Sequence, residues 1–267
     1  MLKYPDINPI AVDFGIIKIH WYGISYVAGI LLAWWLLHRR SKTLYRIWTR
    51  EEVADLIFYT TLGIILGGRL GSVLFYNLPY YLHHPLEIIM INRGGMSFHG
   101  GLIGVCIALW VYGKKQNRGF FTITDFVAPA APIGLFFGRL ANFVNGELWG
   151  RPTDLPWGMV FPRADNLPRH PSQLYEAFLE GIVLFIIMWS YSRKPKPVMA
   201  VSGLFLAGYG LFRGSVEWVR QPDIQVGFLA GGWLTMGMLL SFPMFVLGVF
   251  LLIFAYRRER RETGEGK

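Results

Sequence analysis

Long apolar runs, separated by short polar connections, make up most of this chain. Seven of them are long enough to cross a bilayer, because about 20 predominantly apolar residues in a helix span its hydrocarbon core. The chain is therefore predicted to be an all-α integral membrane protein that forms one domain, residues 1–267, with seven transmembrane helices. The expected helices are 19–38, 53–77, 96–113, 122–144, 174–192, 200–219 and 233–256.

Composition and charge support a membrane protein. Of the 267 residues 53% are hydrophobic and 16% are charged, and the mean hydropathy is +0.38. The net charge is +9, and 16 of the 26 Lys and Arg lie in four short patches after the first, third, fifth and seventh runs. Lys and Arg mark the cytoplasmic side, so the N-terminus is predicted outside and the C-terminus in the cytoplasm. Short patches beside membrane segments suit membrane lipid, and no nucleic acid is expected as a partner. The patches are 39–50, 114–118, 193–196 and 257–267.

Two connections on the expected outer side are more varied in residue type than the connections on the inner side. Residues 78–95 mix aromatic, apolar and His side chains, which suits a segment in the headgroup layer. Residues 145–173 hold five prolines and two tryptophans, enough for a small ordered periplasmic cap. We therefore expect function on the outer face. The single cysteine, Cys106, excludes an intrachain disulfide and a cysteine-based metal site.

Three arginines lie inside apolar runs: Arg69, Arg139 and Arg213. A charged side chain at membrane depth is costly, so each is a candidate functional residue. A planar guanidinium suits bidentate binding of phosphate, so an anionic group at the edge of the bilayer is the expected ligand. The alternative is that these arginines form ion pairs that only hold helices together, and for Arg69 the two interpretations are evenly balanced.

Other polar residues accompany the arginines at helical spacing. Arg139 and Asn142 are spaced i, i+3 and share a helix face, with Glu147 just beyond the expected helix end. Arg213 and Glu217 are spaced i, i+4, so they can pair on one face. These pairs place donors and a carboxylate near the outer end of two helices.

His99 opens the third apolar run, before two glycines. An imidazole can take up a proton near neutral pH, so His99 is a candidate base; the alternative is a solvated side chain. Tyr22 and Tyr209 are candidates for lipid contact, with packing or an interfacial aromatic belt as the alternative. No nucleophile elbow, His-Glu-x-x-His motif or P-loop occurs in the sequence. No metal and no cofactor are expected, since the arginines supply positive charge.

The segment Gly138–Gly150, GRLANFVNGELWG, is similar to the signature of the prolipoprotein diacylglyceryl transferase family. Further stretches that resemble the family follow in its order, from about residue 21 to about residue 223. They are Gly67–Gly71, Phe75–Asn77, Gly95–Gly104, His170–Glu176 and Ser202–Gly210.

The resemblance implies a multi-pass enzyme of the bacterial inner membrane, with its active site toward the periplasm. Such a transferase moves the diacylglyceryl group of phosphatidylglycerol onto the lipobox cysteine of a prolipoprotein signal peptide. A thioether forms and glycerol phosphate leaves, as the first step of lipoprotein maturation.

The resemblance also suggests roles for the candidates. Arg139 and Arg213 would hold the charge of the leaving phosphate, and His99 would be the base for the thiol, with a glutamate as the other possible base. Arg69 stays a third arginine of open role. The expected contacts to phosphatidylglycerol are Arg139, Asn142, Glu147, Gly150, Tyr22, Tyr209 and Glu217.

Two other functions remain open at this point. A phosphatase or transferase that acts on a different lipid phosphate would use the same arginines without a groove for a signal peptide. A non-catalytic anion transporter or lipid-binding scaffold would need a polar path to the inner face, and the inward halves of the runs hold few ionisable residues.

Overall fold

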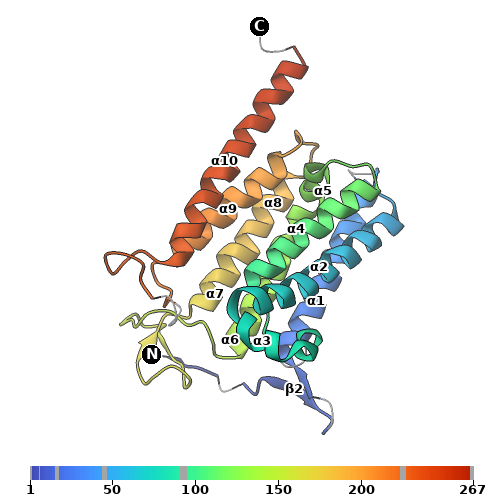
Figure 1. Ribbon diagram of the computed structural model, residues 1–267. Helices are drawn as coiled ribbons and strands as arrows, with labels where there is room; N and C mark the ends of the chain where they lie inside the picture. The colour runs from blue at the N-terminus through green and yellow to red at the C-terminus, as the bar shows by residue number, and fades with distance from the viewer. Residues whose placement is uncertain are drawn as a thin grey trace. The chain divides into compact units, whose positions relative to one another are not determined.

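The computed structural model describes residues 2–5, 7–15, 18–43, 47–90, 95–222 and 227–264, and it is built mainly of helices (Figure 1). It divides into two compact units, residues 1–36 with 125–267 and residues 37–124, so that the divisions fall within helices α1 and α5. The first is called unit 1 and the second unit 2. The single domain expected from the sequence stays a prediction.

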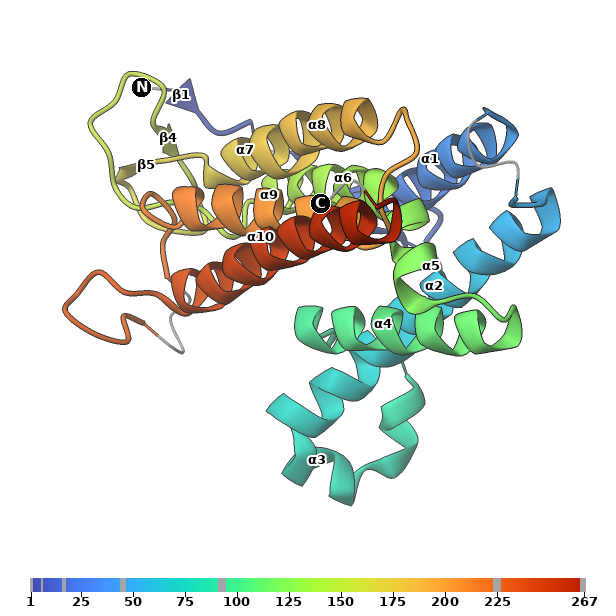
Figure 2. The ribbon, with the colours of Figure 1, turned by 90° about the horizontal axis from the view of Figure 1, so that it is seen from above.

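Unit 2 is built around two helices that cross at very short range (Figure 2). A Cβ added to Gly71 would lie 2.5 Å from the Cα of Gly100, so only glycine permits this approach. Helix α2 begins at a capping box in which Thr49 and Glu52 bond to each other's backbone N–H. The elements that lie wholly in this unit are α2 (Arg50–Tyr76), α3 (Leu78–His83), the 3-10 helix η1 (Pro85–Ile89) and α4 (Phe98–Lys115).

Unit 1 contains the remaining long helices. Helix α7, the π-helix η4 and helix α8 follow one another without a break, and α9 and α10 lie side by side in both views (Figures 1 and 2). A cluster of buried apolar side chains that includes Leu184, Met188 and Val201 joins α8 to α9. The helices are α6 (Ala131–Val144), α7 (Ser172–Glu176), η4 (Ala177–Val183), α8 (Leu184–Tyr191), α9 (Ala200–Val216) and α10 (Met236–Glu262), with η3 (Ala128–Ala130) before α6. Two helices span the division, α1 (Trp21–Thr43) and α5 (Phe120–Val127).

The start of α9 is held by a side chain from another helix. The Asp125 carboxylate accepts hydrogen bonds from the backbone N–H groups of Met199 and Ser202, both at 2.7 Å, and from the Ser202 hydroxyl at 2.6 Å. The first N–H groups of a helix have no partner within it, so an aspartate from α5 does the work of a cap. This contact fixes where α9 begins.

Residues 145–173 form an ordered cap at the end of unit 1 where α6 ends and α7 begins (Figure 1). Its strands β4 (Met159–Val160) and β5 (Pro168–Arg169) pair antiparallel, and β1 (Leu2–Lys3) pairs parallel with β4. A separate hairpin joins β2 (Ile10–Asp13) to β3 (Lys18–His20). The other expected outer connection, 78–95, forms α3 and η1, and its residues 91–94 lie outside the described residues.

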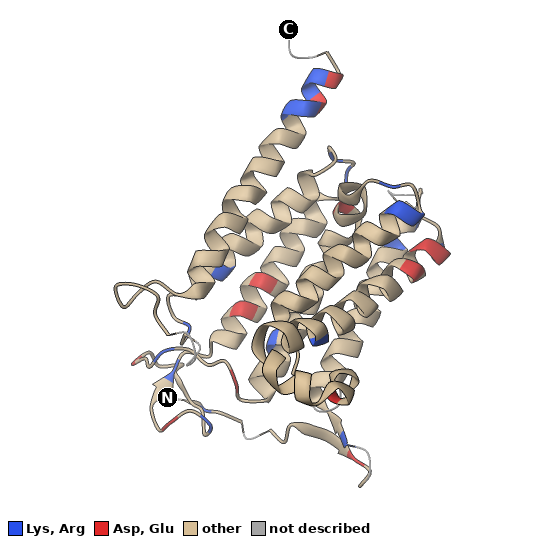
Figure 3. Ribbon diagram, viewed as in Figure 1, with Lys and Arg blue, Asp and Glu red and all other residues tan. Residues whose placement is uncertain are grey.

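Five helical segments in the described part of the chain are long and apolar enough to cross a membrane. Figure 3 shows that most charged residues lie at helix ends and in connections, with a basic end on α10. The other two expected spans correspond to α4, with 18 residues, and α9, with 17 residues. The five segments are Trp21–Thr43, Arg50–Tyr76, Phe120–Val144, Ser172–Tyr191 and Met236–Glu262.

Candidate active site

A buried ion-pair network lies among the helices of unit 1. Arg139, on α6, places its Nε 2.6 Å from Oε2 of Glu176 and its Nη2 3.4 Å from Oε2 of Glu180. Glu176 ends α7 and Glu180 lies in η4, and their side chains are 1% and 0% exposed. They are the two charged residues of the helical stretch Ser172–Tyr191. The network thus ties α6 to the helix that follows the cap.

The network continues to α9. Arg213 places Nη1 3.2 Å from Oε1 of Glu176 and Nη2 2.5 Å from Oε1 of Glu217, so the i, i+4 pair expected from the sequence is confirmed. Arg220 Nη1 lies 3.3 Å from the same oxygen of Glu217, and the Thr235 hydroxyl donates to the other carboxylate oxygen at 2.5 Å. The carboxylates of Glu176 and Glu217 therefore connect α6, α7, α9 and the start of α10.

Three guanidiniums and three carboxylates balance in charge across this network. Balance matters because an unpaired buried charge costs several kcal/mol. The ion pairs do connect helices, which agrees with the alternative interpretation that these arginines hold helices together. In the described part of the chain, however, the Nη1 of Arg139 has no hydrogen-bond or ion-pair partner. Arg139 therefore keeps a donor that an anionic ligand can use.

A second polar cluster lies one helical turn farther along α6. Asn142 donates from Nδ2 to Oε1 of Glu147 at 2.8 Å, and Asn145 donates to the same oxygen at 3.4 Å. Tyr22, at the start of α1, is close enough to Asn142 and Glu147 to interact with both. Gln173 donates from Nε2 to the Glu147 backbone carbonyl at 2.6 Å. The structure thus brings together Tyr22, Asn142 and Glu147.

Gly150 lies where three backbone segments meet. Its N–H donates to the carbonyl of His170 at 2.8 Å, and a Cβ at this position would lie 2.6 Å from the Val219 carbonyl oxygen. The glycine is therefore required by close packing of the cap, and its expected contact with lipid stays a prediction. Burial lowers the pKa of the neighbouring His170 below its usual value.

Tyr209 is buried on α9 and stacks on Phe205, with ring centroids 6.1 Å apart. Its hydroxyl is within electrostatic range of Arg139 and Glu180. Tyr209 therefore packs against Phe205 and also lies beside the ion-pair network.

Arg69 and His99 belong to unit 2. The buried Arg69 guanidinium donates to the backbone carbonyls of Glu87, Ile88 and Gly95 at 2.5, 2.8 and 3.3 Å. It therefore holds the segment that leads into α4. His99 is exposed in the first turn of α4, one residue after Phe98. Its role as a base, and any role of Arg69 toward phosphate, stay predictions.

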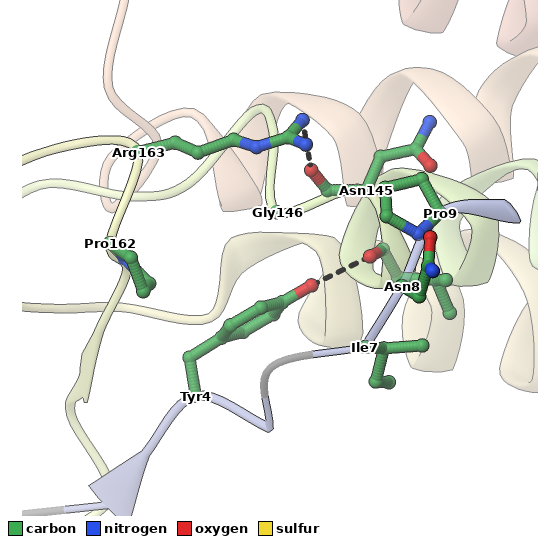
Figure 4. Close-up of a pocket in the computed structure, with 9 residues that line it drawn as sticks. Tyr4, Ile7, Asn8, Pro9, Asn145, Gly146, Pro162 and Arg163 are labelled. Carbon is green, nitrogen blue, oxygen red and sulfur yellow. Dashed lines mark hydrogen bonds between the residues drawn. The ribbon is translucent and has the colours of Figure 1, made fainter.

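A cavity of about 320 Å³ opens beside the end of α6, on unit 1. Figure 4 shows Arg163 donating to the Asn145 carbonyl, at 2.9 Å, and Tyr4 pointing at the end of the helix, where its hydroxyl meets the Phe143 and Val144 carbonyls at 2.6 and 2.7 Å. Among the described residues that line the cavity, Arg163 alone is charged, and it is exposed. The described lining therefore holds none of the buried charged residues that make up the network. Its lining is Tyr4, Ile7, Asn8, Pro9, Val144, Asn145, Gly146, Pro162 and Arg163.

The sequence analysis gave no individual role to six residues of these clusters, which are Glu176, Glu180, Arg220, Gln173, Asn145 and Thr235. Glu176 and Glu180 are acidic residues in or at the edge of an apolar run, so the rule that selected the arginines would also have selected them. Gln173 lies in the family-like stretch His170–Glu176, which did not single it out, and Arg220 carries no such signal, because its importance comes from its partners in space. Over the described ranges, no group of three or more His, Cys, Asp or Glu is placed to hold a metal ion.

The sequence is similar to a known protein family and to named bacterial proteins. The family described as prolipoprotein diacylglyceryl transferase matches residues 9–254. A phosphatidylglycerol–prolipoprotein diacylglyceryl transferase of Azotobacter vinelandii is 56% identical over 262 residues, 98% of this chain and 99% of the relative. Proteins of the same name from Methylococcus capsulatus and Pseudomonas aeruginosa are 57% and 54% identical over 259 residues, 97% of this chain and 99% and 97% of those relatives.

Proposed function

The chain belongs to the prolipoprotein diacylglyceryl transferase family, and we propose on that basis that it transfers the diacylglyceryl group of phosphatidylglycerol to prolipoproteins. It is a transferase of the first step of lipoprotein maturation. The structural observation that carries the assignment of the site is the buried network around Arg139, which lies next to the Asn142 and Glu147 cluster.

We further propose how the chain lies in the membrane. Its five long apolar helices make it a multi-pass membrane protein, and α4 and α9 bring the number of proposed spans to seven. The basic patches after alternate spans support a cytoplasmic C-terminus and an outer N-terminus in the bacterial inner membrane. The cap formed by residues 145–173 and the adjoining network then face the periplasm.

In the proposed reaction the lipobox cysteine thiol loses its proton, and the thiolate sulfur attacks the glycerol carbon that carries the phosphate. A C–S bond forms, the C–O bond to phosphate breaks, and glycerol phosphate leaves with the electron pair. The leaving group gains negative charge, so preorganised donors must stabilise it. Arg139 and Arg213 are proposed to do this, because Arg139 is partly buried, Arg213 is buried, and Glu176 holds both in place.

The other proposed roles follow from position. Asn142, Glu147 and Tyr22 form the cluster next to Arg139 and would orient the headgroup. Glu217 would position Arg213, to which it is paired at 2.5 Å. His99 is the proposed base for the thiol, with a glutamate as the alternative. If His99 takes the proton, His99→Gln should lower kcat with little change in the lipid KM, whereas a glutamate base would leave kcat nearly unchanged.

The proposal is tested by following glycerol phosphate release from phosphatidylglycerol by the purified protein, with and without a lipobox peptide. A transferase releases it only when the peptide thiol is present and stops in Arg139→Ala. Release without peptide would point to a lipid phosphate hydrolase. Lipid binding without release by a folded protein would favour a non-catalytic scaffold.

A further inference from the structure

Gln173 is a fully buried amide with one oxygen that finds no donor. The residue is 0% exposed, and its Oε1 has no hydrogen-bond partner in the described part of the chain. Its Nε2 donates to the Glu147 carbonyl at 2.6 Å, and this contact fixes the orientation of the amide, since turning it over would set two oxygens against each other. A buried acceptor without a donor costs free energy and requires an explanation.

The position of Gln173 relative to the arginines is set by two neighbouring helices. On α6, Asn142 lies one turn from Arg139, and on α7, Gln173 lies one turn from Glu176. Arg139 bonds to Glu176, and Asn142 and Gln173 both bond to Glu147, through its side chain and its backbone respectively. The site therefore has two levels, the first with the guanidinium and the second, nearer the cap, with the amides.

A lipid phosphodiester with a polyol headgroup matches these two levels. Its phosphate suits the guanidinium level, where Arg139 keeps Nη1 as a donor. Its acyl chains must extend away from the cap, so the headgroup lies toward it, about one helical turn of 5.4 Å farther along. Hydroxyl groups of a glycerol headgroup are donors, and a donor is what the Gln173 oxygen lacks.

We propose that Gln173 is a specificity-determining residue that accepts a hydrogen bond from a headgroup hydroxyl of phosphatidylglycerol. The inference rests on the proposed function and extends it to the choice among anionic lipids. A site built to bind a hydroxyl rejects an analogue without it, because the buried acceptor is then left unpaired. Gln173 would thus select a glycerol headgroup over an alkyl one of equal charge.

The test compares two lipids with the same acyl chains, phosphatidylglycerol and phosphatidylpropanol, whose headgroup has no hydroxyl. The wild-type protein is expected to prefer phosphatidylglycerol in kcat/KM by about tenfold, the size of one such hydrogen bond. Gln173→Met keeps the side-chain length and removes the acceptor, together with the Nε2 donor to Glu147, so its preference should fall to within about twofold. Both rates are measured on one preparation of each variant. Partial unfolding lowers the concentration of active protein for both lipids equally and leaves the ratio of the two kcat/KM values unaltered.

Ser172→Ala is the matched control. Ser172 is equally buried and donates to the Leu148 carbonyl at 3.0 Å, so its loss weakens the same loop without touching the orphan oxygen. It should lower both rates equally and keep the preference. If Gln173→Met is inactive, Gln173→Asn, which withdraws the amide by one methylene, should lose the preference in its place.

Two results would overturn the inference and leave the proposed function intact: a wild-type protein that uses both lipids equally, or a Gln173 variant that keeps the wild-type preference. The second is also what a structural water on this oxygen predicts. A wild-type protein that transfers neither lipid would overturn the proposed function itself.

Discussion

Replacing Arg139 by lysine keeps the charge of the network and removes its geometry. Arg139 reaches Glu176 through Nε, at 2.6 Å, and Glu180 through Nη2, at 3.4 Å, while Nη1 has no partner in the described part of the chain. A lysine ammonium is a single point donor on a flexible stem and cannot hold this fork. The substitution therefore separates a phosphate contact through Nη1, made while the rest of the guanidinium holds Glu176 and Glu180, from simple charge neutralisation.

The expected loss can be worked out from these contacts. The lysine can replace the short bond to Glu176 and cannot at the same time reach the phosphate with a fixed second donor. A hydrogen bond to a charged group is worth about 1.5–3 kcal/mol. If that bond forms in the transition state, kcat/KM falls roughly 10- to 150-fold. The balance of buried charge is unchanged, so the folded protein should persist.

The assay measures diacylglyceryl transfer to a lipobox peptide, with the thermal midpoint in detergent as the check on folding. Arg163→Lys is the matched control, since Arg163 is exposed in the adjacent cavity and, among the described residues, bonds the Asn145 carbonyl alone, at 2.9 Å. An exposed change of this kind should alter the rate by about twofold or less. A folded Arg139→Lys protein with an equally small loss would refute the argument from the guanidinium fork.

Four further outcomes are expected. Glu176→Gln takes a carboxylate from three guanidiniums, those of Arg139, Arg213 and Arg220, and should destabilise the protein by about 3 kcal/mol, seen as a lower thermal midpoint; an unchanged midpoint would contradict the network. Asp125→Ala removes three hydrogen bonds at the start of α9 and should cost about 3 kcal/mol with little change in KM, and a change in KM alone would speak against a structural role. Arg69→Met frees the carbonyls of residues 87, 88 and 95, so hydrogen exchange of the backbone amides in this segment should accelerate. Unchanged exchange would contradict the conclusion that Arg69 holds the segment that leads into α4. His170 has a lowered pKa in the folded protein, so stability should fall as the pH drops below about 6.5, where the unfolded chain takes up the proton; the fall should be smaller in His170→Gln, and an equal fall in both would reject burial as its cause.

Much of the architecture can be predicted from hydrophobic runs, because helix length and the absence of charges are local properties. The i, i+4 pair of Arg213 and Glu217 was predictable for the same reason, since helical spacing alone places them on one face. The ordered cap at residues 145–173 followed from its composition.

The partners of Arg139 were not predictable from local spacing. Glu180 lies 41 residues from Arg139 along the chain and meets it only because α6 packs on η4. The π-helical stretch Ala177–Val183 changes the helical period at that point, and the pattern of apolar residues did not predict it. An apolar-run search that treats buried acids like buried arginines would have found Glu176 and Glu180, though not which arginine each one binds.

The most direct test of the central claim is the intact mass of a lipobox peptide after incubation with the purified protein and phosphatidylglycerol, beside a twin peptide with Cys→Ser. The account predicts a diacylglyceryl mass increase on the cysteine peptide alone, with glycerol phosphate formed in equal amount. An unmodified cysteine peptide, in the presence of folded protein and intact lipid, would contradict it.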